Sequence, residues 1–444
     1  MHEDLATTID ALLPELRNDL EDLIRIPSVS AAHFDPAEVR RSASKAAELL
    51  EKAGFEDVQL LEIEDAHPAV YGERPGPAGS PTVLLYAHHD VQPPGDEAEW
   101  TVAPFEPMER DGRLYGRGSS DDKAGIIVHT GAVRAFGPDL PVGVKVFIEG
   151  EEEIGSAHLG DFLAEHGELL AADVIVIADS GNWRVGVPAL TTSLRGLVSV
   201  LVEVRTLENG VHSGMFGGVV PDALTTLARV LAGLHDERGN VAVPGLVTGE
   251  AAALDLTEEE ARAQSGVLDG VELIGEGSLT TRLWMKPAIS VLAIDAPPLN
   301  EAINQLVPVA RAKVSMRTAP AQDPGLAMEA LVAHISDQPA WGAEVTVTPH
   351  ESGEGFALSS EDPRVMAFRD AFASAWGHEA VEMGVGGGIP FVAAFSERFP
   401  DAAILLTGVA DPTSRAHGPD ESLDLEELRR GMLAEAIALR NLAS

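Results

Sequence analysis

The chain of 444 residues contains no cysteine, and this absence removes several kinds of chemistry at once. Disulfide bonds, thiolate metal ligands and cysteine nucleophiles are all excluded. A metal site in this protein must therefore be built from imidazole and carboxylate groups. Such groups suit zinc, and also cobalt or manganese.

Long apolar runs are absent as well. No segment reaches the roughly 18 apolar residues that a membrane-spanning helix needs. The first segment lacks a basic region followed by an apolar block, so we expect an amphipathic helix there and not a signal peptide. Its apolar residues stand at helical spacing: Leu5, Ile9, Leu12, Leu13, Leu16, Leu20 and Leu23. These features predict a cytoplasmic protein that does not enter a membrane.

Basic residues are scarce: 31 Lys and Arg stand against 71 Asp and Glu, which gives a net charge of −40. A surface of this sign repels nucleic acid and anionic lipid, so we expect neither as a partner. It also attracts cations, although an adaptation to solubility or salt is the simpler explanation of the charge. Hydrophobic residues make up 45% of the chain, enough for a sizeable core. The length suggests about two or three domains.

The order of the predicted elements indicates two kinds of domain. Strands at 82–88, 144–149 and 174–179 alternate with helices at 123–136 and 157–166, the pattern of a mixed, mostly parallel α/β sheet. From about residue 191 the pattern changes to a compact α+β unit, with strands at 196–205, 289–294, 309–317 and 343–348 and helices at 221–235 and 324–336. We therefore predict one domain made of residues 1–190 and 351–444, with a separate domain of residues 191–350 inserted into it. The acidic segment 250–277 receives no function.

Polar residues that can bind metal follow the predicted parallel strands. Ligands of such sheets gather beyond the carboxyl ends of the strands, where His88, the acidic run 149–153 and Asp179 stand. Because side chains alternate along an extended segment, His88 and Asp90 face the same side, and Asp90 can hold the histidine ring. Each of these residues alone also has a simpler explanation: a core histidine, a solvated charge run or a turn cap.

Two further segments add potential ligands. A glycine-rich loop at 116–120 delivers Asp121 and Asp122 to the start of a helix, where aspartates are also common N-caps. His417 lies in a polar loop after a predicted strand at 403–406, and a lone loop histidine is usually inert. Taken together, three carboxylates and two imidazoles at strand ends and loops match a two-metal site.

Several motifs of the chain resemble the M20 metallopeptidases, in particular their carnosinase-like dipeptidase branch. They occur in the family's order and span almost the whole chain. The matching segments are YAHHDVQP at 86–93, LYGRGSSDDK at 114–123, EGEEEIGS at 149–156, Asp179, NGVHSGMFGG at 209–218, and GGGIP at 386–390 with His417.

The resemblance implies a role for each potential ligand. Asp121 would bridge two divalent metal ions, with zinc as the first choice and manganese or cobalt as alternatives. His88 and Asp179 would complete the site of one ion, and Glu153 and His417 that of the other. By the same resemblance Glu152 is the general base, Asp90 orients His88, and the peptide bond between Asp121 and Asp122 is cis.

The resemblance also implies that residues 1–190 and 351–444 form the catalytic domain and that residues 191–350 form a lid or dimerisation domain, some of whose residues it assigns. His212 resembles a histidine that reaches into the active site of a partner subunit, which implies a homodimer formed through this domain. Arg317 matches an arginine that binds the terminal carboxylate of the substrate, beside the glycine loop with Gly387 and Gly388. Val385 and Gly388 stand where the family often has a glutamate and a hydroxyl residue, so backbone N–H groups would replace a side-chain contact. His89 stands where an aromatic residue is frequent, and we assign it no role.

The function implied is that of a two-metal hydrolase that cleaves the amide bond of dipeptides or other short peptides with a free C-terminal carboxylate. A water shared by the metals would attack the carbonyl, with Glu152 taking its proton. Removal of an N-acyl group from an amino acid on the same scaffold is the alternative, although the segment 211–218 favours the dipeptidase branch. A non-catalytic binding protein that keeps the fold is the rival from another class.

Overall fold

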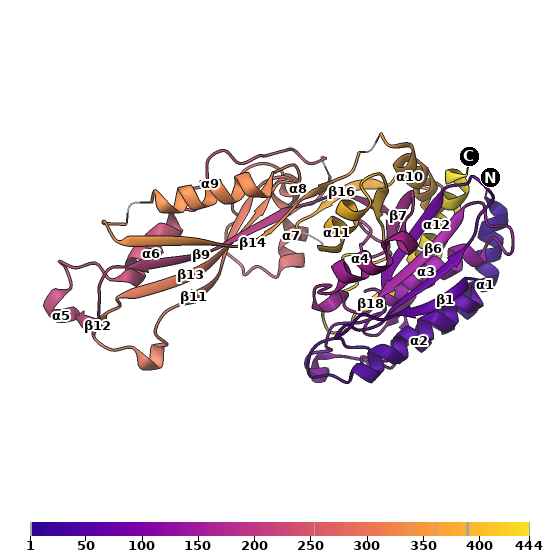
Figure 1. Cartoon of the computed structure of the whole chain (residues 1–444), viewed down its shortest axis with the longest axis horizontal. Coiled ribbons are helices and arrows are strands. Elements are labelled where there is room, and N and C mark those ends of the chain that lie inside the picture. The colour runs from indigo at the N-terminus through magenta and orange to yellow at the C-terminus, as the bar shows by residue number, and fades with distance from the viewer. Residues whose placement is uncertain (1, 253, 339, 360, 388–389, 444) are drawn as a thin grey trace. The chain divides into compact units, whose positions relative to one another are not determined.

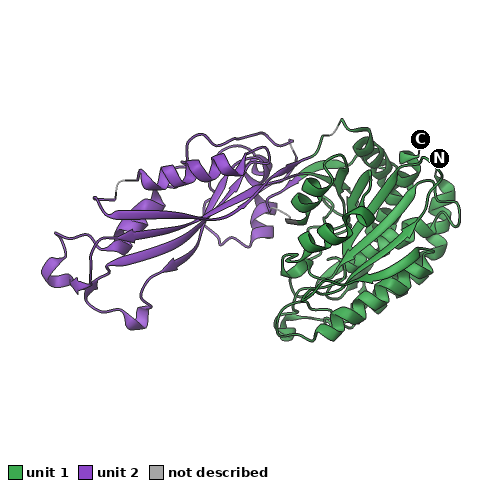
Figure 2. Cartoon of the chain, viewed as in Figure 1, with its two compact units in different colours: residues 1–192, 358–383, 390–444 green, residues 193–357, 384–389 purple. Residues whose placement is uncertain are grey.

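The structure is a computed structural model that describes residues 2–252, 254–338, 340–359, 361–387 and 390–443. The chain forms two compact units (Figure 2). Unit 1 consists of residues 1–192, 358–383 and 390–444, and unit 2 consists of residues 193–357 and 384–389. The sequence prediction for the same division was 1–190, 191–350 and 351–444. The structure groups residues 384–389, which include most of the glycine loop at 386–390, with unit 2.

A mixed sheet forms the centre of unit 1, in the order β1-β2-β6-β3-β7-β17-β8. The pairs β6–β3, β3–β7 and β7–β17 are parallel, whereas the outer pairs are antiparallel. This confirms the predicted fold class of a mixed sheet with a parallel centre. The strands are β1 (Glu56–Leu61), β2 (Ala69–Arg74), β3 (Thr82–His88), β6 (Gly143–Glu149), β7 (Val174–Ile177), β8 (Ala189–Leu194) and β17 (Ala403–Leu406).

Helices cover both faces of this sheet (Figure 1). The larger layer packs on a core that includes Val83, Leu85 and Ala87 of β3. Its helices are α1 (Glu3–Ile24), α2 (Pro36–Lys52), α3 (Lys123–Arg134), α10 (Pro363–Trp376) and α12 (Leu425–Leu442). On the other face lie α4 (Leu159–Leu170) and α11 (Pro390–Arg398). The ring of Tyr86 stacks on Phe391 of α11 with 4.8 Å between centroids, and Phe147 of β6 packs on Phe162 of α4. Because β3 is covered on both faces, its sequence is a continuous apolar run.

Local sequence signals explain where these helices begin and end. The side chain of Asp35 accepts a hydrogen bond from the Ala37 N–H at the start of α2, and Gly54, with a φ of 83°, follows its end. The predicted helix 157–166 is shifted: α4 runs from Leu159 to Leu170, because the buried Gly167 and Leu170 continue its apolar face. The predicted helix 123–136 ends two residues earlier, at Arg134.

A small second sheet in unit 1 ties the C-terminal region to the segment before α3. It has the order β18-β5-β4, formed by β4 (Met108–Arg110), β5 (Arg113–Tyr115) and β18 (Ser422–Asp424). Ser422 pairs with Tyr115, and Asp424 pairs with Arg113. β5 ends just before the loop that carries Asp121, so this pairing brings the C-terminal region next to that loop.

Unit 2 is built on a four-stranded antiparallel sheet, β11-β13-β9-β14. Its strands are β9 (Gly196–Arg205), β11 (Ala288–Asp295), β13 (Val309–Thr318) and β14 (Glu344–Gly353), and the helices α6 (Ala223–Ala232) and α9 (Pro324–Ser336) pack on one face. This confirms the predicted α+β insertion. The predicted strand 343–348 is longer than expected, because β14 is an edge strand and tolerates Pro349. The predicted helix 221–235 is the shorter α6.

The remaining elements of unit 2 are short. They are β10 (Val211–His212), β12 (Gln305–Leu306), α5 (Ser213–Phe216), α7 (Glu258–Ser265), α8 (Leu279–Trp284) and β15 (Phe356–Ala357), while β16 (Val381–Val385) spans the point where the chain enters residues 384–389. The helix α7 lies in the acidic segment 250–277 and begins with a capping box between Thr257 and Glu260. Within the described residues, no helix is both long enough and apolar enough to cross a membrane.

Candidate metal centre

Three parallel strands of unit 1 deliver polar residues to the same edge of the sheet. β3 ends at His88, and β6 ends at Glu149 and leads into the short turn η2 (Glu152–Ile154). β7 ends at Ile177, two residues earlier than predicted, so Asp179 lies in the loop beyond the strand. This edge is where α/β sheets place their ligands.

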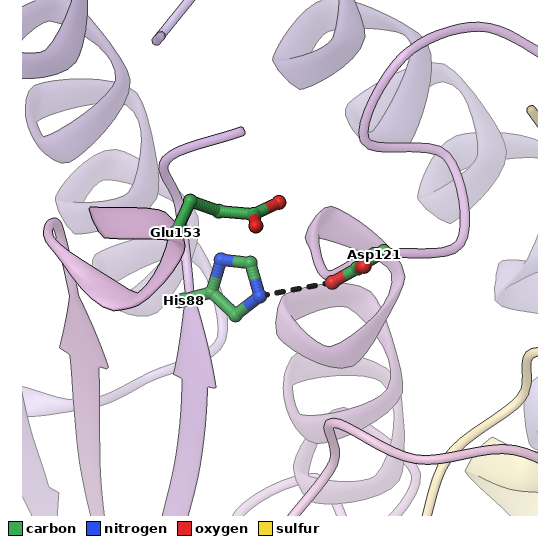
Figure 3. A group of neighbouring side chains, drawn as sticks. All are labelled: His88, Asp121 and Glu153. Atoms are coloured by element: carbon green, nitrogen blue, oxygen red, sulfur yellow. Dashed lines mark hydrogen bonds and ion pairs between the residues drawn. The ribbon is translucent and has the colours of Figure 1, made fainter. Parts of the chain in front are cut away.

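The potential ligand atoms form two overlapping groups. In the first, His88, Asp121 and Glu153 offer ligand atoms that all lie within 4.8 Å of one another, and in the second His88, Glu152 and Asp179 do the same. Figure 3 shows the side chains of the first group turned toward a common space. His88 belongs to both groups and is fully buried.

Asp121 lies between the two imidazoles. Its Oδ1 is 3.1 Å from His88 Nε2, and its Oδ2 is 3.0 Å from His417 Nε2. His417 Nε2 is also 3.2 Å from Glu153 Oε2. The peptide bond between Asp121 and Asp122 is cis, as the resemblance implied. A carboxylate whose two oxygens face two different imidazoles has the arrangement needed to bridge two cations.

Asp90 fixes both the histidine ring and the turn that follows β6. His88 Nδ1 lies 3.1 Å from the main-chain oxygen of Asp90 and 3.4 Å from its carboxylate, which leaves Nε2 for a ligand bond. The Asp90 carboxylate also accepts hydrogen bonds from Ser30 Oγ at 2.7 Å and from the N–H groups of Glu152 and Glu153. Although burial opposes it, the bonds from His88 and Ser30 lower the pKa of Asp90.

The acidic run contains side chains with different surroundings. The Glu153 carboxylate accepts hydrogen bonds from the N–H of Gln92 at 3.1 Å and from its side-chain amide at 2.8 Å. Glu151 is buried and accepts the His67 N–H at 2.7 Å, with His158 Nδ1 at 2.8 Å. Glu152 instead lies in the metal-ligand cluster, 4.0 Å from His88 Nε2. Glu152 therefore differs from Glu151 and Glu153, whose carboxylates accept hydrogen bonds from neighbouring residues.

Burial, hydrogen bonds and neighbouring charges shift the pKa of several groups in the cluster. Hydrogen bonds with Asp121 and Glu153 raise the pKa of His417 to about 10. Burial, followed by the charge of Asp121, raises the pKa of Asp179 well above its usual value, and burial raises that of Glu152 to about 7. The cluster thus holds protons that its groups would ordinarily release at neutral pH. Divalent cations displace such protons, so imidazole and carboxylate groups placed this way fit hard or borderline metal ions.

Sequence reasoning missed several residues that hold the ligands in place. Arg117 and Glu421 form a buried ion pair behind Asp121 and His417, with 2.6 Å between Nη1 and Oε2. Gln92 holds Glu153, and Ser30 holds Asp90. Gln92 and Arg117 lie within the motifs that carry the resemblance, which is the one signal that could have singled them out. Ser30 and Glu421 have no comparable signal.

The other predicted site residues belong to unit 2. His212 precedes α5, where its Nδ1 accepts the Gly214 N–H at 3.1 Å, so the proton of a neutral ring lies on Nε2. Arg317 lies on the face of β13 opposite to its buried residues. Arg195 donates from Nε to the main-chain oxygen of Gly386 at 3.0 Å, which holds the glycine loop next to Gly387. Gly388 lies outside the described residues.

A mixed α/β sheet whose strand ends gather two histidines and several carboxylates defines the scaffold of a metal-dependent hydrolase. Residues 84–441 match the Peptidase family M20/M25/M40. The chain belongs to this family and is a peptidase.

Individual relatives agree with this assignment. The chain is 36% identical to the cysteinylglycine-S-conjugate dipeptidase of Corynebacterium striatum, over 96% of this chain and 95% of that protein. Human carnosine dipeptidase 1 shares 25% of its residues and superimposes with a TM-score of 0.76, covering 99% of this chain and 98% of that chain. A dipeptidase of Saccharomyces cerevisiae has the same fold, with a TM-score of 0.77 at 24% identity, over 100% of this chain and 99% of that chain.

Proposed function

We propose that this peptidase hydrolyses the amide bond of dipeptides and other short peptides with a free C-terminal carboxylate, using two divalent metal ions. The observation that carries the proposal is the position of Asp121, whose two oxygens face His88 and His417. The names of the relatives support a dipeptide as the substrate. Zinc is our first choice of metal, because imidazole and carboxylate ligands suit it, as they also suit cobalt and manganese.

The proposed ligands are His88, Asp121, Glu153, Asp179 and His417, with Asp121 shared by both ions. Divalent ions bound there would supply Lewis-acid activation of a water and of the scissile carbonyl. Asp90 would keep the Nδ1 proton of His88 in place, so that Nε2 remains a lone-pair donor.

Glu152 is our proposed general base. It would accept the proton of the attacking water and pass it to the leaving amine nitrogen. Glu152 belongs to the group with His88 and Asp179, and 21% of its side chain is exposed, so a water at the cluster can reach its carboxylate. The proton on Nε2 of His212 would donate a hydrogen bond to the carbonyl oxygen as negative charge develops on it.

Arg317 is our proposed reader of the substrate carboxylate. Within the described part of the chain, its guanidinium has no ion-pair partner, although the chain has a large excess of acidic residues. A guanidinium fork matches a carboxylate with two parallel hydrogen bonds. Gly387 is our proposed source of a further backbone N–H, because a side chain there would meet nothing within 4 Å and the main chain is open to a ligand.

A homodimer formed through unit 2 is part of the proposal. Large apolar side chains of this unit are exposed, and large apolar side chains are enriched at protein interfaces. The exposed side chains include Met215, Phe216, Val219, Leu292, Ile294, Leu299 and Ile303. β11 is an edge strand with one partner among the described strands, so it can pair with a second chain. A cytoplasmic location stays a prediction.

A substrate panel run with added Zn2+, Co2+ or Mn2+ tests the proposal. It contains plain dipeptides, S-conjugates of cysteinylglycine, C-terminally amidated dipeptides and N-acyl amino acids. We expect turnover of free dipeptides and little turnover of the amidated or acylated compounds. Faster cleavage of N-acyl amino acids would favour the deacylase alternative.

A further inference from the structure

A buried ion pair that the mechanism does not use lies behind the ligand cluster. Arg117 Nη1 and Glu421 Oε2 are 2.6 Å apart, and the two side chains are 1% and 0% exposed. The two residues are 304 positions apart in the sequence. Further hydrogen bonds offset much of the cost of burying the two charges, although Arg117 Nε has no hydrogen-bond partner among the described residues. Here those further bonds lead to the proposed ligands.

Glu421 gathers the N–H groups of the loop that carries Asp121. Its carboxylate accepts hydrogen bonds from the N–H of Gly118 at 3.0 Å, of Ser120 at 3.0 Å and of Asp121 at 3.2 Å. The hydroxyl of Ser120 donates a fourth bond at 3.1 Å. One carboxylate thus fixes the backbone of the loop up to the shared ligand itself.

Arg117 extends the same connection to His417. Its Nη2 donates to the main-chain oxygen of His417 at 3.1 Å and to that of Pro93 at 3.3 Å, while its Nη1 holds Glu421. The planar guanidinium therefore bonds Glu421 and the main-chain oxygens of Pro93 and His417 at the same time. A lysine ammonium group lacks this fixed fork of donors.

The loop around His417 depends on such support. Arg415, His417 and Asp420 have φ values of 55°, 65° and 58°, a left-handed conformation that non-glycine residues rarely adopt. Residues keep it where their surroundings hold them. The bond from Arg117 to the His417 oxygen is one such contact, and the bond from the Thr101 N–H to Asp420 at 2.7 Å is another.

We propose that Arg117 and Glu421 form a positioning pair that sets the spacing between Asp121 and His417 and thereby the affinity for the metal ion these two ligands share. Neither side chain contacts the reacting atoms, so their effect passes through the ligands. The inference rests on the proposed function in that it needs metal ions at this cluster.

Metal affinity tests the proposal directly. Metal-free protein is titrated with Zn2+ in a calorimeter for the wild type, Glu421→Gln and Arg117→Lys. Glutamine keeps the shape of Glu421 but turns an NH2 group toward N–H donors, and lysine keeps the charge of Arg117 but loses its fork. We expect the affinity for Zn2+ to fall by about tenfold to a hundredfold in Glu421→Gln. We expect a smaller loss in Arg117→Lys, with kcat reduced more than KM is raised in both variants.

Glu435→Gln is the matched control. Glu435 is also a buried carboxylate with a charged partner, because it lies 2.9 Å from His129 Nδ1, but it contacts no proposed ligand. This variant should lose thermal stability and keep wild-type affinity for Zn2+. If Glu421→Gln does not fold, Arg117→Lys carries the test, with the absorption spectrum of bound Co2+ as a second reading of ligand geometry.

Two results would overturn the positioning role. One is wild-type Zn2+ affinity in a folded Glu421→Gln or, where that variant does not fold, in Arg117→Lys. The other is an equal loss of affinity in Glu435→Gln, which would show a general effect of stability. Wild-type protein that binds Zn2+ but cleaves no dipeptide would refute the proposed function alone, because the affinity comparison does not depend on turnover.

Discussion

Replacing Glu152 by glutamine should abolish nearly all turnover and leave metal binding in place. Glutamine has the size of glutamate but cannot accept a proton from water. Glu152 stands at the cluster with 21% of its side chain exposed and its Oε2 4.0 Å from His88 Nε2, so a water at the site can reach it. Among the described residues, no hydrogen bond or ion pair other than this contact holds its carboxylate, so the loss of charge leaves no neighbour unsatisfied.

The expected loss of kcat in Glu152→Gln follows from the proposed role of Glu152 as general base. Loss of a general base costs about a hundredfold to ten-thousandfold in rate. At about 1.36 kcal/mol for each factor of ten, this corresponds to about 2.7–5.5 kcal/mol of transition-state stabilisation. The assay is kcat at saturating dipeptide, together with the metal content per chain. We expect the metal content of the variant to equal that of the wild type.

The neighbouring Glu151 supplies the control. Its carboxylate is already occupied by the His67 N–H and by His158, so Glu151→Gln should lower thermal stability and reduce kcat by less than about tenfold. The assignment of Glu152 as the base would be wrong if Glu152→Gln kept more than about a tenth of the wild-type kcat while kcat of Glu151→Gln fell by the hundredfold or more that we expect of Glu152→Gln.

Three further predictions concern other residues. Arg317→Ala should lower kcat/KM for a dipeptide by roughly tenfold to a hundredfold, because a charge-assisted hydrogen bond contributes about 1.5–3 kcal/mol. The loss should be much smaller for an amidated dipeptide. Equal losses on both substrates would refute the role of Arg317. Mixing Glu152→Gln with His212→Ala protein should restore some activity, because one hybrid site has both groups intact, and no rescue after demonstrated subunit exchange would refute catalysis across a dimer. Although burial opposes it, Glu435 raises the pKa of His129 in the folded protein. The pair therefore stabilises the fold fully at pH values below the unfolded-state pKa of His129. This stabilisation is lost as the pH rises through the folded-state pKa of His129. The Tm difference between wild type and His129→Gln should therefore be larger at about pH 6 than at about pH 9, and an equal difference at both would contradict the charge on His129.

The sequence predicted His88, the acidic run 149–153 and Asp179 as candidate site residues because they stand at the ends of short apolar runs, whereas Asp121 and His417 were found in polar loops. The end of a buried parallel strand is a fixed place in the fold, so the order of apolar runs alone assigns His88 and the acidic run to one edge of the sheet. The same reasoning put Asp179 inside a strand that in fact ends at Ile177. A strand end depends on where its partners stop, and β17 pairs with β7 only as far as Ile177.

The supporting residues could not be predicted in this way. Glu421 reaches the Asp121 loop because the three-residue strand β18 pairs with β5, and so short a strand gives no periodic signal. The contacts of His89 could not be predicted from the sequence either. The ring is fully buried and bonds the Pro68 oxygen at 2.9 Å, and a Cβ added to Gly150 would meet its Nε2 at 2.8 Å. His89 is therefore part of the packing under the turn that follows β6, which fits the absence of any assigned role.

Metal binding and substrate selection should be separable in this protein, because the candidate ligands and their supporting residues all belong to unit 1, whereas His212 and Arg317 belong to unit 2. Substitutions at residues that share no partners usually have independent effects. His212→Ala and Arg317→Ala should therefore keep wild-type Zn2+ affinity and stoichiometry while turnover falls. Glu421→Gln should weaken Zn2+ binding in the same titration. If either unit 2 variant weakened Zn2+ binding by about tenfold, a difference of about 1.4 kcal/mol, unit 2 would have to contribute to the metal site itself, and the assignment of all five ligands to unit 1 would fail.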